Sequence, residues 1–254
     1  EDSAVLLEAL SGYSSEGEYI TINESRLDLS RISKKTNFKI GFSKTIGGAK
    51  LDKDISDSIN NAMNSFDREY DSKVDVIDFY PESIEEIYNI FFDFFCTKGY
   101  ASDPELIDNP ELKSEVTDYL IRNWEHGKNV TGSRLFECYN KIGYYRDYLN
   151  NFFKNYDFLV TPTMATTAFE VNKHPQKVGG VEVNDEFWDF TPFTYYFNLT
   201  GNPAATVPIG LDENKLPIGL QIVGEMGKEF EVLQISKLFE KLFKWPETKA
   251  SISI

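Results

Sequence analysis

The chain has 254 residues, enough to bury a large core, and its 20 Phe and 14 Tyr argue against a disordered chain. A net charge of -15 argues against a nucleic-acid partner, because phosphates would be repelled. Two cysteines do not form a disulfide framework, and no apolar run reaches the ~18 residues of a membrane-spanning helix. These features predict a cytoplasmic protein without membrane contact.

The beginning of the chain predicts the end of a helix followed by a loop. Apolar residues recur between positions 4 and 10, and Gly12 is a typical helix stop. Residues 14–35 are polar and mixed, which is typical of a surface loop. Because the chain starts within helix-like sequence and without Met, we expect it to be a piece of something longer.

The next segment predicts a strand, a helix and a second strand. Residues 38–42 alternate as a strand does, and residues 74–79 predict the second strand. Asp52 is a candidate N-cap for the helix between them. Four apolar residues share one face of that helix: Ile55, Ile59, Ala62 and Phe66. This order indicates an α/β layered architecture.

The middle of the chain predicts three helices. The first covers residues 82–97, and the second starts at Asn109–Pro110 and runs to about His126. The third runs from Thr131 to about Tyr156. Its apolar residues recur at helical spacing and indicate core packing: Leu135, Tyr139, Ile142, Tyr145, Leu149 and Phe152.

The last third of the chain predicts a strand, a long loop, a hairpin and a helix. The strand covers residues 158–160 and ends at Pro162, and a loop of about two dozen residues follows. Two short apolar runs, residues 193–208 and 216–224, then predict strands that are buried on both faces. Residues 229–243 predict the final helix, and the tail from residue 246 is expected to be loose.

The residue pattern alone shows no complete catalytic constellation. His126 and His174 stand apart, and neither a metal-ligand spacing nor a cofactor motif is present. Residues 47–50 lack most of a phosphate-binding loop, and Ser14–Ser15 lie beside carboxylates that would disfavour an oxyanion. Cys138 is predicted to be a small core side chain. A Cys138–His126 hydrolase stays open as an alternative, because a thiolate and an imidazole that are distant in sequence can meet in space.

Four separated segments resemble the amidase-signature family and occur in the family's order. They are residues 1–13 (E-D-x-A-L-L-L-E-x-L-A-G-Y in the family), 40–48 (I-G-Y-S-x-x-x-G-G), 156–163 (Y-D-x-L-L-T-P-T), and 193–224 (F-T-x-P-F-N-L-T-G-N-P-A, then G-L-P-x-G-L-Q-I-V-G). The resemblance implies an α/β fold in which a mixed β-sheet is flanked by helices as α/β/α layers, here incomplete. It also implies a serine amidohydrolase.

The family's catalytic groups are a Ser–cis-Ser–Lys triad and a Gly/Ser-rich oxyanion loop, and both lie upstream of the E-D-x-A-L-L-L helix. The resemblance therefore implies that residues 1–254 are the C-terminal part of a single domain, without its catalytic N-terminal part. No residue of this chain inherits a catalytic role, and we expect the fragment alone to be inactive. The intact protein is expected to hydrolyse a small-molecule amide. The expected partners are the missing N-terminal half and a second copy of the chain.

The resemblance also implies which residues shape the substrate pocket. In the family, the F-T-x-x-F-N stretch and the loop after T-P-T face the substrate. Those segments contain Met164, Thr191, Phe193, Thr194 and Tyr195, with Trp124 further off. Core packing stays the alternative for each aromatic residue. Tyr196 stands where the family usually has Pro, and Asn198, Gly201 and Pro203 are expected to set a turn.

Two branches of the family and one other class of function can be compared. Residues 198–203 read N-L-T-G-N-P, whereas the tRNA-dependent amidotransferases typically read N-L-A-G-L-P in the corresponding subunit, which favours a general amidase. Residues 169–189 are polar, unlike the apolar cap with which fatty-acid amide hydrolases dock on membranes. The alternative class is a non-catalytic binding or assembly module that retains the amidase architecture.

Overall fold

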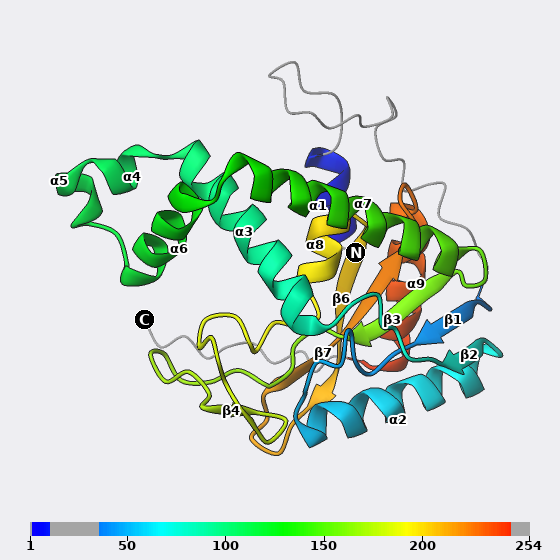
Figure 1. The fold of residues 1–254 in the computed structure, drawn as a ribbon. Helices are drawn as coiled ribbons and strands as arrows, with labels where there is room; N and C mark the ends of the chain where they lie inside the picture. The colour runs from blue at the N-terminus through cyan, green and yellow to red at the C-terminus, as the bar shows by residue number, and fades with distance from the viewer. Residues whose placement is uncertain (1, 11–35, 245–254) are drawn as a thin grey trace.

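The computed structural model describes residues 2–10 and 36–244, which form a mixed β-sheet between helical layers (Figure 1). The sheet has the order β2-β1-β3-β7-β6. Its strands are β1 (Lys39–Phe42), β2 (Lys73–Val76), β3 (Phe158–Pro162), β6 (Ala204–Leu211) and β7 (Pro217–Gly224). β1 is parallel to β2 and β3, and β7 is antiparallel to β3 and β6. The predicted α/β class with a mixed sheet is confirmed.

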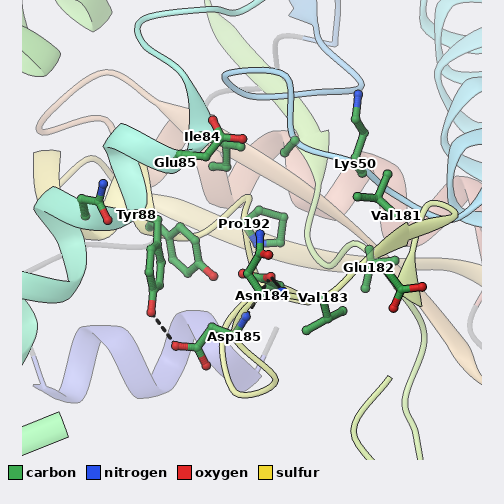
Figure 2. Close-up of a pocket in the computed structure, with 15 residues that line it drawn as sticks. Lys50, Ile84, Glu85, Tyr88, Val181, Glu182, Val183, Asn184, Asp185 and Pro192 are labelled. Carbon is green, nitrogen blue, oxygen red and sulfur yellow. Dashed lines mark hydrogen bonds between the residues drawn. The ribbon is translucent and has the colours of Figure 1, made fainter. Parts of the chain in front are cut away.

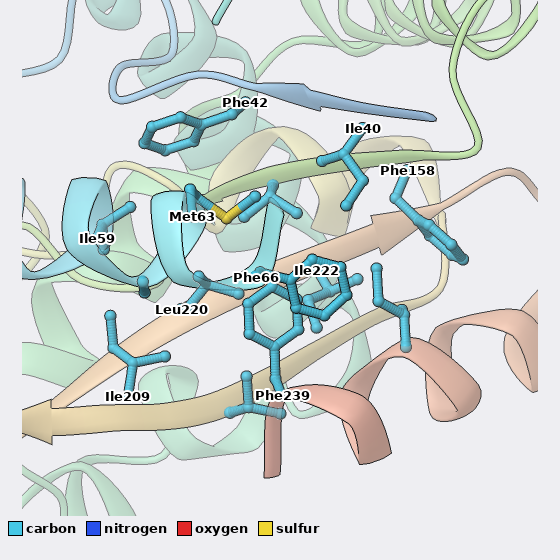
Figure 3. Close-up of a cluster of buried hydrophobic side chains, with 14 of the residues drawn as sticks. Ile40, Phe42, Ile59, Met63, Phe66, Phe158, Ile209, Leu220, Ile222 and Phe239 are labelled. Carbon is cyan, nitrogen blue, oxygen red and sulfur yellow. The ribbon is translucent and has the colours of Figure 1, made fainter. Parts of the chain in front are cut away.

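Two helices, α2 (Lys53–Tyr70) and α9 (Glu229–Leu242), cover one face of the sheet. The apolar residues of α2 recur at helical spacing, so Ile55, Ile59 and Phe66 are all buried. The Phe66 ring stacks on Phe239 of α9 with centroids 4.1 Å apart, and the strand residue Ile222 belongs to the same cluster (Figure 3). This layer joins segments from Phe38 to Phe243 in one core.

The other face carries α3 (Ile84–Ser102), α7 (Gly132–Phe153) and the short helix α8 (Tyr195–Thr200). Side chains of Ser83 and Thr131 cap α3 and α7 by accepting backbone N–H groups three residues on. The predicted core role of α7 is confirmed at Tyr145 and Leu149, which are buried, whereas Tyr139 is exposed. The candidate functional site also lies on this face of the sheet.

A helical arm follows α3 and projects from the body of the molecule (Figure 1). It consists of α4 (Glu105–Asp108), α5 (Pro110–Lys113) and α6 (Asp118–Asn129). The prediction of one helix from residue 109 to 126 is therefore wrong. α5 ends at Lys113, and the side chain of Thr117 starts a new helix by accepting the N–H of Leu120. Pro110 does stand at the first turn, as predicted.

Residues 193–200 are also not a strand. Residues Tyr195–Thr200 form α8, Gly201 ends it with a left-handed backbone (φ 78°), and β6 begins only at Ala204. A short apolar run that is buried on all sides looks the same in a strand and in a buried helix, which explains the error. The second half of the stretch and β7 form the predicted hairpin.

Smaller differences concern the termini and Asp52. α1 (Asp2–Leu10) is helical as predicted, while its stop at Gly12, the loop at 14–35 and the tail from 246 lie outside the described residues. Asp52 precedes α2 but makes no side-chain cap hydrogen bond. The long loop after β3 contains a short hairpin, β4 (Lys177–Val178) and β5 (Val181–Glu182).

Candidate functional site

A cavity of about 450 Å³ lies between the start of α3, the β4–β5 hairpin with the loop after it, and the start of α8 (Figure 2). This volume is within the usual range for small-molecule sites. Its apolar lining comes from these three segments and from the loop before α2: Ala49, Ile84, Tyr88, Val178, Val181, Val183, Pro192 and Tyr195. Carboxylates and amides of Glu85, Glu182 and Asn184 belong to exposed residues of the same lining.

Asp185 ties the loop to α3. Its carboxylate accepts the hydroxyl of Tyr88 at 2.6 Å and the backbone N–H of Phe187 at 3.0 Å. Burial and the hydrogen bond to Asp185 raise the pKa of Tyr88 far above its ordinary value. Tyr88 is therefore a neutral phenol, and it donates to the carboxylate at every physiological pH.

Arg122 of α6 holds the same carboxylate from the arm. Its Nη1 lies 3.1 Å from Asp185 Oδ1. Three aromatic rings surround the guanidinium, with centroids 4.9 Å (Phe187), 5.6 Å (Phe92) and 5.8 Å (Tyr119) from its central carbon. A guanidinium is attracted to aromatic faces, so the arm and the loop stabilise one another through this residue.

The hairpin is fixed at its other end by Asp52. The Asp52 carboxylate accepts the backbone N–H of Gly179 at 2.8 Å. Gly179 has a φ of 57°, and a Cβ at this position would lie 2.7 Å from the carbonyl oxygen of Leu51, so only glycine fits. The carboxylate predicted to cap α2 instead holds a wall of the cavity.

Two of the residues expected to shape a pocket line cavities. Tyr195 lines the main cavity, where its ring stacks on Phe91 with centroids 4.8 Å apart and its hydroxyl donates to the carbonyl of Trp188. Met164 lines a second cavity of about 350 Å³, together with Phe190. The structure therefore brings these two residues to different hollows.

The other four expected residues support the backbone or the core. Thr194 donates from its N–H (3.2 Å) and its hydroxyl (3.0 Å) to the carbonyl of Thr191. Phe193 is fully buried, and its carbonyl accepts the side-chain amide of Gln221 at 2.9 Å. Trp124 packs over Gly99 between α6 and α3 and lines neither cavity.

The residue pattern gave no indication of Tyr88, Arg122 or Asp185. Asp185 is 97 positions from Tyr88 and 63 from Arg122. Neither spacing matches a helix or a strand period, and each residue type is common on surfaces. Their meeting is a product of tertiary packing.

The structure gives no support to a Cys138–His126 hydrolase. His126 Nε2 lies 2.6 Å from a carboxylate oxygen of Asp93. Cys138 is fully buried, as predicted for a core residue, and burial raises the pKa of its thiol. A nucleophilic cysteine needs a lowered pKa, so Cys138 is not activated.

Metal binding and membrane crossing find no support in the described parts of the chain. Within residues 2–10 and 36–244, no group of three or more His, Cys, Asp or Glu side chains is arranged to hold a metal ion. Among the helices of the same residues, none combines the length and the apolar character required to cross a membrane. The cavity between α3, the hairpin loop and α8 is thus the main candidate site.

The three-layered α/β fold agrees with comparisons to known proteins. The family model for amidases matches residues 1–233, and the chain belongs to this family. An acylamidase from Rhodococcus erythropolis is 32% identical over 157 residues, which cover 61% of this chain and 33% of that protein. A 6-aminohexanoate-cyclic-dimer hydrolase from Paenarthrobacter ureafaciens is 27% identical over 187 residues, which cover 67% of this chain and 37% of the relative.

Solved structures of the family share the fold. A bacterial aryl acylamidase of the amidase-signature family superposes with a TM-score of 0.74 at 23% identity, over 87% of this chain and 47% of that one. The 6-aminohexanoate cyclic dimer hydrolase, complexed with substrate, gives a TM-score of 0.73 at 22% identity, over 96% and 53%. The chain thus spans between a third and about half of the length of these relatives. The family consists of enzymes that act on the C–N bonds of amides.

Proposed function

We propose that residues 1–254 are the C-terminal part of a single amidase-signature domain, and that they form one wall of the substrate pocket of an enzyme that hydrolyses a small-molecule carboxylic amide. The observation that carries this proposal is the family match over residues 1–233 in a chain about half as long as its structural neighbours. The N-terminal part supplies the Ser–cis-Ser–Lys triad. In that triad a neutral Lys takes a proton through the bridging Ser, and the second Ser attacks the amide carbon.

Two surfaces of the described chain suit a covering N-terminal part. β6 is at the edge of the sheet, and within residues 36–244 it pairs with β7 alone. α1 exposes large apolar side chains, including Leu6 at 60% and Leu10 at 76%. Unpaired strand edges and exposed apolar helices favour association, so a chain lacking this cover would self-associate, a homodimer being the simplest product.

The pocket residues have graded roles in this proposal. Met164 lines the second cavity, and Tyr195, which is 1% exposed, supports the wall of the main cavity that receives the substrate. Thr191, Phe193 and Thr194 set the backbone before α8, and Trp124 fixes the arm that carries Arg122. We also propose a cytoplasmic location, because both cysteines are free thiols, as expected in a reducing compartment.

The test is complementation. Residues 1–254 and the polypeptide encoded upstream in the same reading frame are purified separately and assayed, alone and mixed, against a panel of neutral amides. We expect turnover only in the mixture, and a raised KM when Tyr195→Ala is introduced. Amide hydrolysis by residues 1–254 alone, abolished by mutating one of its own residues, would overturn the proposal. An upstream region with no Gly/Ser-rich segment would favour the non-catalytic module instead.

A further inference from the structure

We infer that the 450 Å³ cavity receives the uncharged, apolar part of the amide, an alkyl or aryl group, and rejects an amide that carries a carboxylate at this end. The inference rests on the proposed function only in taking the ligand to be an amide. It follows from how the buried and half-buried polar side chains of the cavity are already occupied.

Three polar side chains of the lining are committed to partners within the chain. Tyr88 donates to Asp185, and Tyr195 donates to the carbonyl of Trp188. Asp189 accepts two backbone N–H groups, from Asn184 at 2.6 Å and from Asp185 at 3.0 Å. A polar ligand group that replaced any of these bonds would leave a protein group unpaired, which costs about 1–3 kcal/mol.

Arg122 is the cation behind this wall, and it is occupied as well. Besides Asp185, its Nε and Nη2 donate to the side-chain oxygen of Asn123, at 3.1 and 3.0 Å. Asn123 is itself buried, aromatic rings lie around the guanidinium, and Arg122, whose side chain is 40% exposed, lines a separate surface hollow and not this cavity. A ligand carboxylate would therefore lose its water without gaining this cation, an unfavourable exchange.

The remaining charges of the lining are at the rim. They belong to three exposed residues, Lys50, Glu85 and Glu182, of which Lys50 and Glu182 lie across the cavity from Tyr88 (Figure 2). Glu182 also pairs with Lys177 at 3.0 Å. An exposed ion pair contributes only about 0–1 kcal/mol, so these residues do not recover the cost of burying a charge.

What the cavity does offer is apolar contact. Ile84, Val178 and Val183 lie around the rings of Tyr88 and Tyr195, whose centroids are 5.7 Å apart at an interplanar angle of 54°. Because Tyr195 is only 1% exposed, a planar aryl group would pack against the half-buried Tyr88 ring and against Ile84 and Val183, and apolar carbons gain about 25 cal/mol per Å² that they bury. The lining thus favours hydrophobic amides such as anilides.

The experiment measures binding to the 254-residue chain by calorimetry and ligand-observed NMR, without any turnover. Acetanilide is compared with para-acetamidobenzoate, which differs by one carboxylate. We expect acetanilide to bind at least about tenfold more tightly. Val183→Asn should weaken acetanilide binding about threefold or more, while Val171→Asn, at a side chain that is 88% exposed, leaves it unchanged.

A second variant tests the role of Asp185. Asp185→Asn removes the negative partner of Arg122, so para-acetamidobenzoate should gain affinity relative to acetanilide, by about tenfold. Equal or tighter binding of the carboxylate to the unaltered chain overturns the inference, and so does an absence of acetanilide binding at roughly 10 mM. Insensitivity to Val183→Asn places any binding outside this cavity and has the same consequence. Failure of the complementation assay alone would instead refute the proposed function and leave the binding preference standing.

Discussion

Two buried tyrosines that face each other across α7 and α8 differ in one respect. The hydroxyl of Tyr196 donates to the carbonyl of Tyr145 at 2.8 Å, whereas the hydroxyl of Tyr145 has no hydrogen-bond partner among the described residues. Both residues have no exposed surface. Tyr196→Phe deletes a hydrogen bond and should lower the free energy of unfolding by about 1 kcal/mol. Tyr145→Phe deletes an unpaired buried hydroxyl, whose desolvation costs about 1–3 kcal/mol, and should raise it.

The two deletions should therefore change the free energy of unfolding in opposite directions, and the two variants should differ in it by roughly 2–4 kcal/mol. Urea unfolding measures this difference as a shift of the midpoint at constant m. Tyr139→Phe, at a ring that is 54% exposed, is the control and should change little. Equal losses at Tyr145 and Tyr196 would refute the reasoning. Tyr196→Phe should also weaken acetanilide binding, because it loosens the helix that presents Tyr195 to the cavity.

Three further predictions concern packing, the hairpin and a buried thiol. Gly127→Ala should cost about 2–3 kcal/mol in urea unfolding, because its Cβ would overlap the carbonyl of Cys96, whereas Gly143→Ala, with open space around it, should be neutral or stabilising. Asp52→Ala should release the β4–β5 hairpin, and the amide of Gly179 should then exchange faster. Unchanged exchange would show that the Asp52–Gly179 hydrogen bond does not hold the hairpin. Burial raises the pKa of the Cys96 thiol to about 12, so Cys96 should resist thiol reagents at pH 8 until the chain unfolds. The stability linked to this protonated thiol is fully present below about pH 9, where the thiol is protonated in both states, and it is lost as the pH rises from 9 towards 12. Urea midpoints of the chain and of Cys96→Ala, measured across this range, test the loss.

The layers of the fold could be predicted because the sequence periods are strong. Ile55, Ile59 and Phe66 form one buried stripe of α2. β1 and β3 are short, mostly apolar runs that contain a glycine and a proline, respectively. The prediction of a single helix over residues 109–126 was wrong for a local reason. A threonine cap in the middle of a polar segment competes with helix continuation, and the apolar pattern there is too weak to decide.

The candidate site could be predicted only in part. The resemblance to the amidase-signature motifs led to Tyr195 and Met164, and each of these residues lines a cavity. The Tyr88–Asp185–Arg122 group depends on α6 lying close against α3, and that approach depends on two helical glycines, Gly99 and Gly127. Glycine in a helix is normally a weakening residue, so its use as a contact point becomes visible only in three dimensions.

The stretch from residue 193 to 208 joins the site to the sheet through a short junction. Gly201 ends α8 in a left-handed conformation, Asn202 donates its side-chain amide to the carbonyl of Gly224 at 2.9 Å, and the carbonyl of Pro203 accepts the N–H of Gly224 at 2.9 Å. Asn198, expected in the turn, is instead inside α8. Because these bonds tie the end of α8 to the last residue of β7, α8 cannot shift along its axis without breaking them. The position of Tyr195 in the cavity is thus set from the sheet side by the N-L-T-G-N-P segment, and this explains why a pocket residue and a strand share one sequence motif.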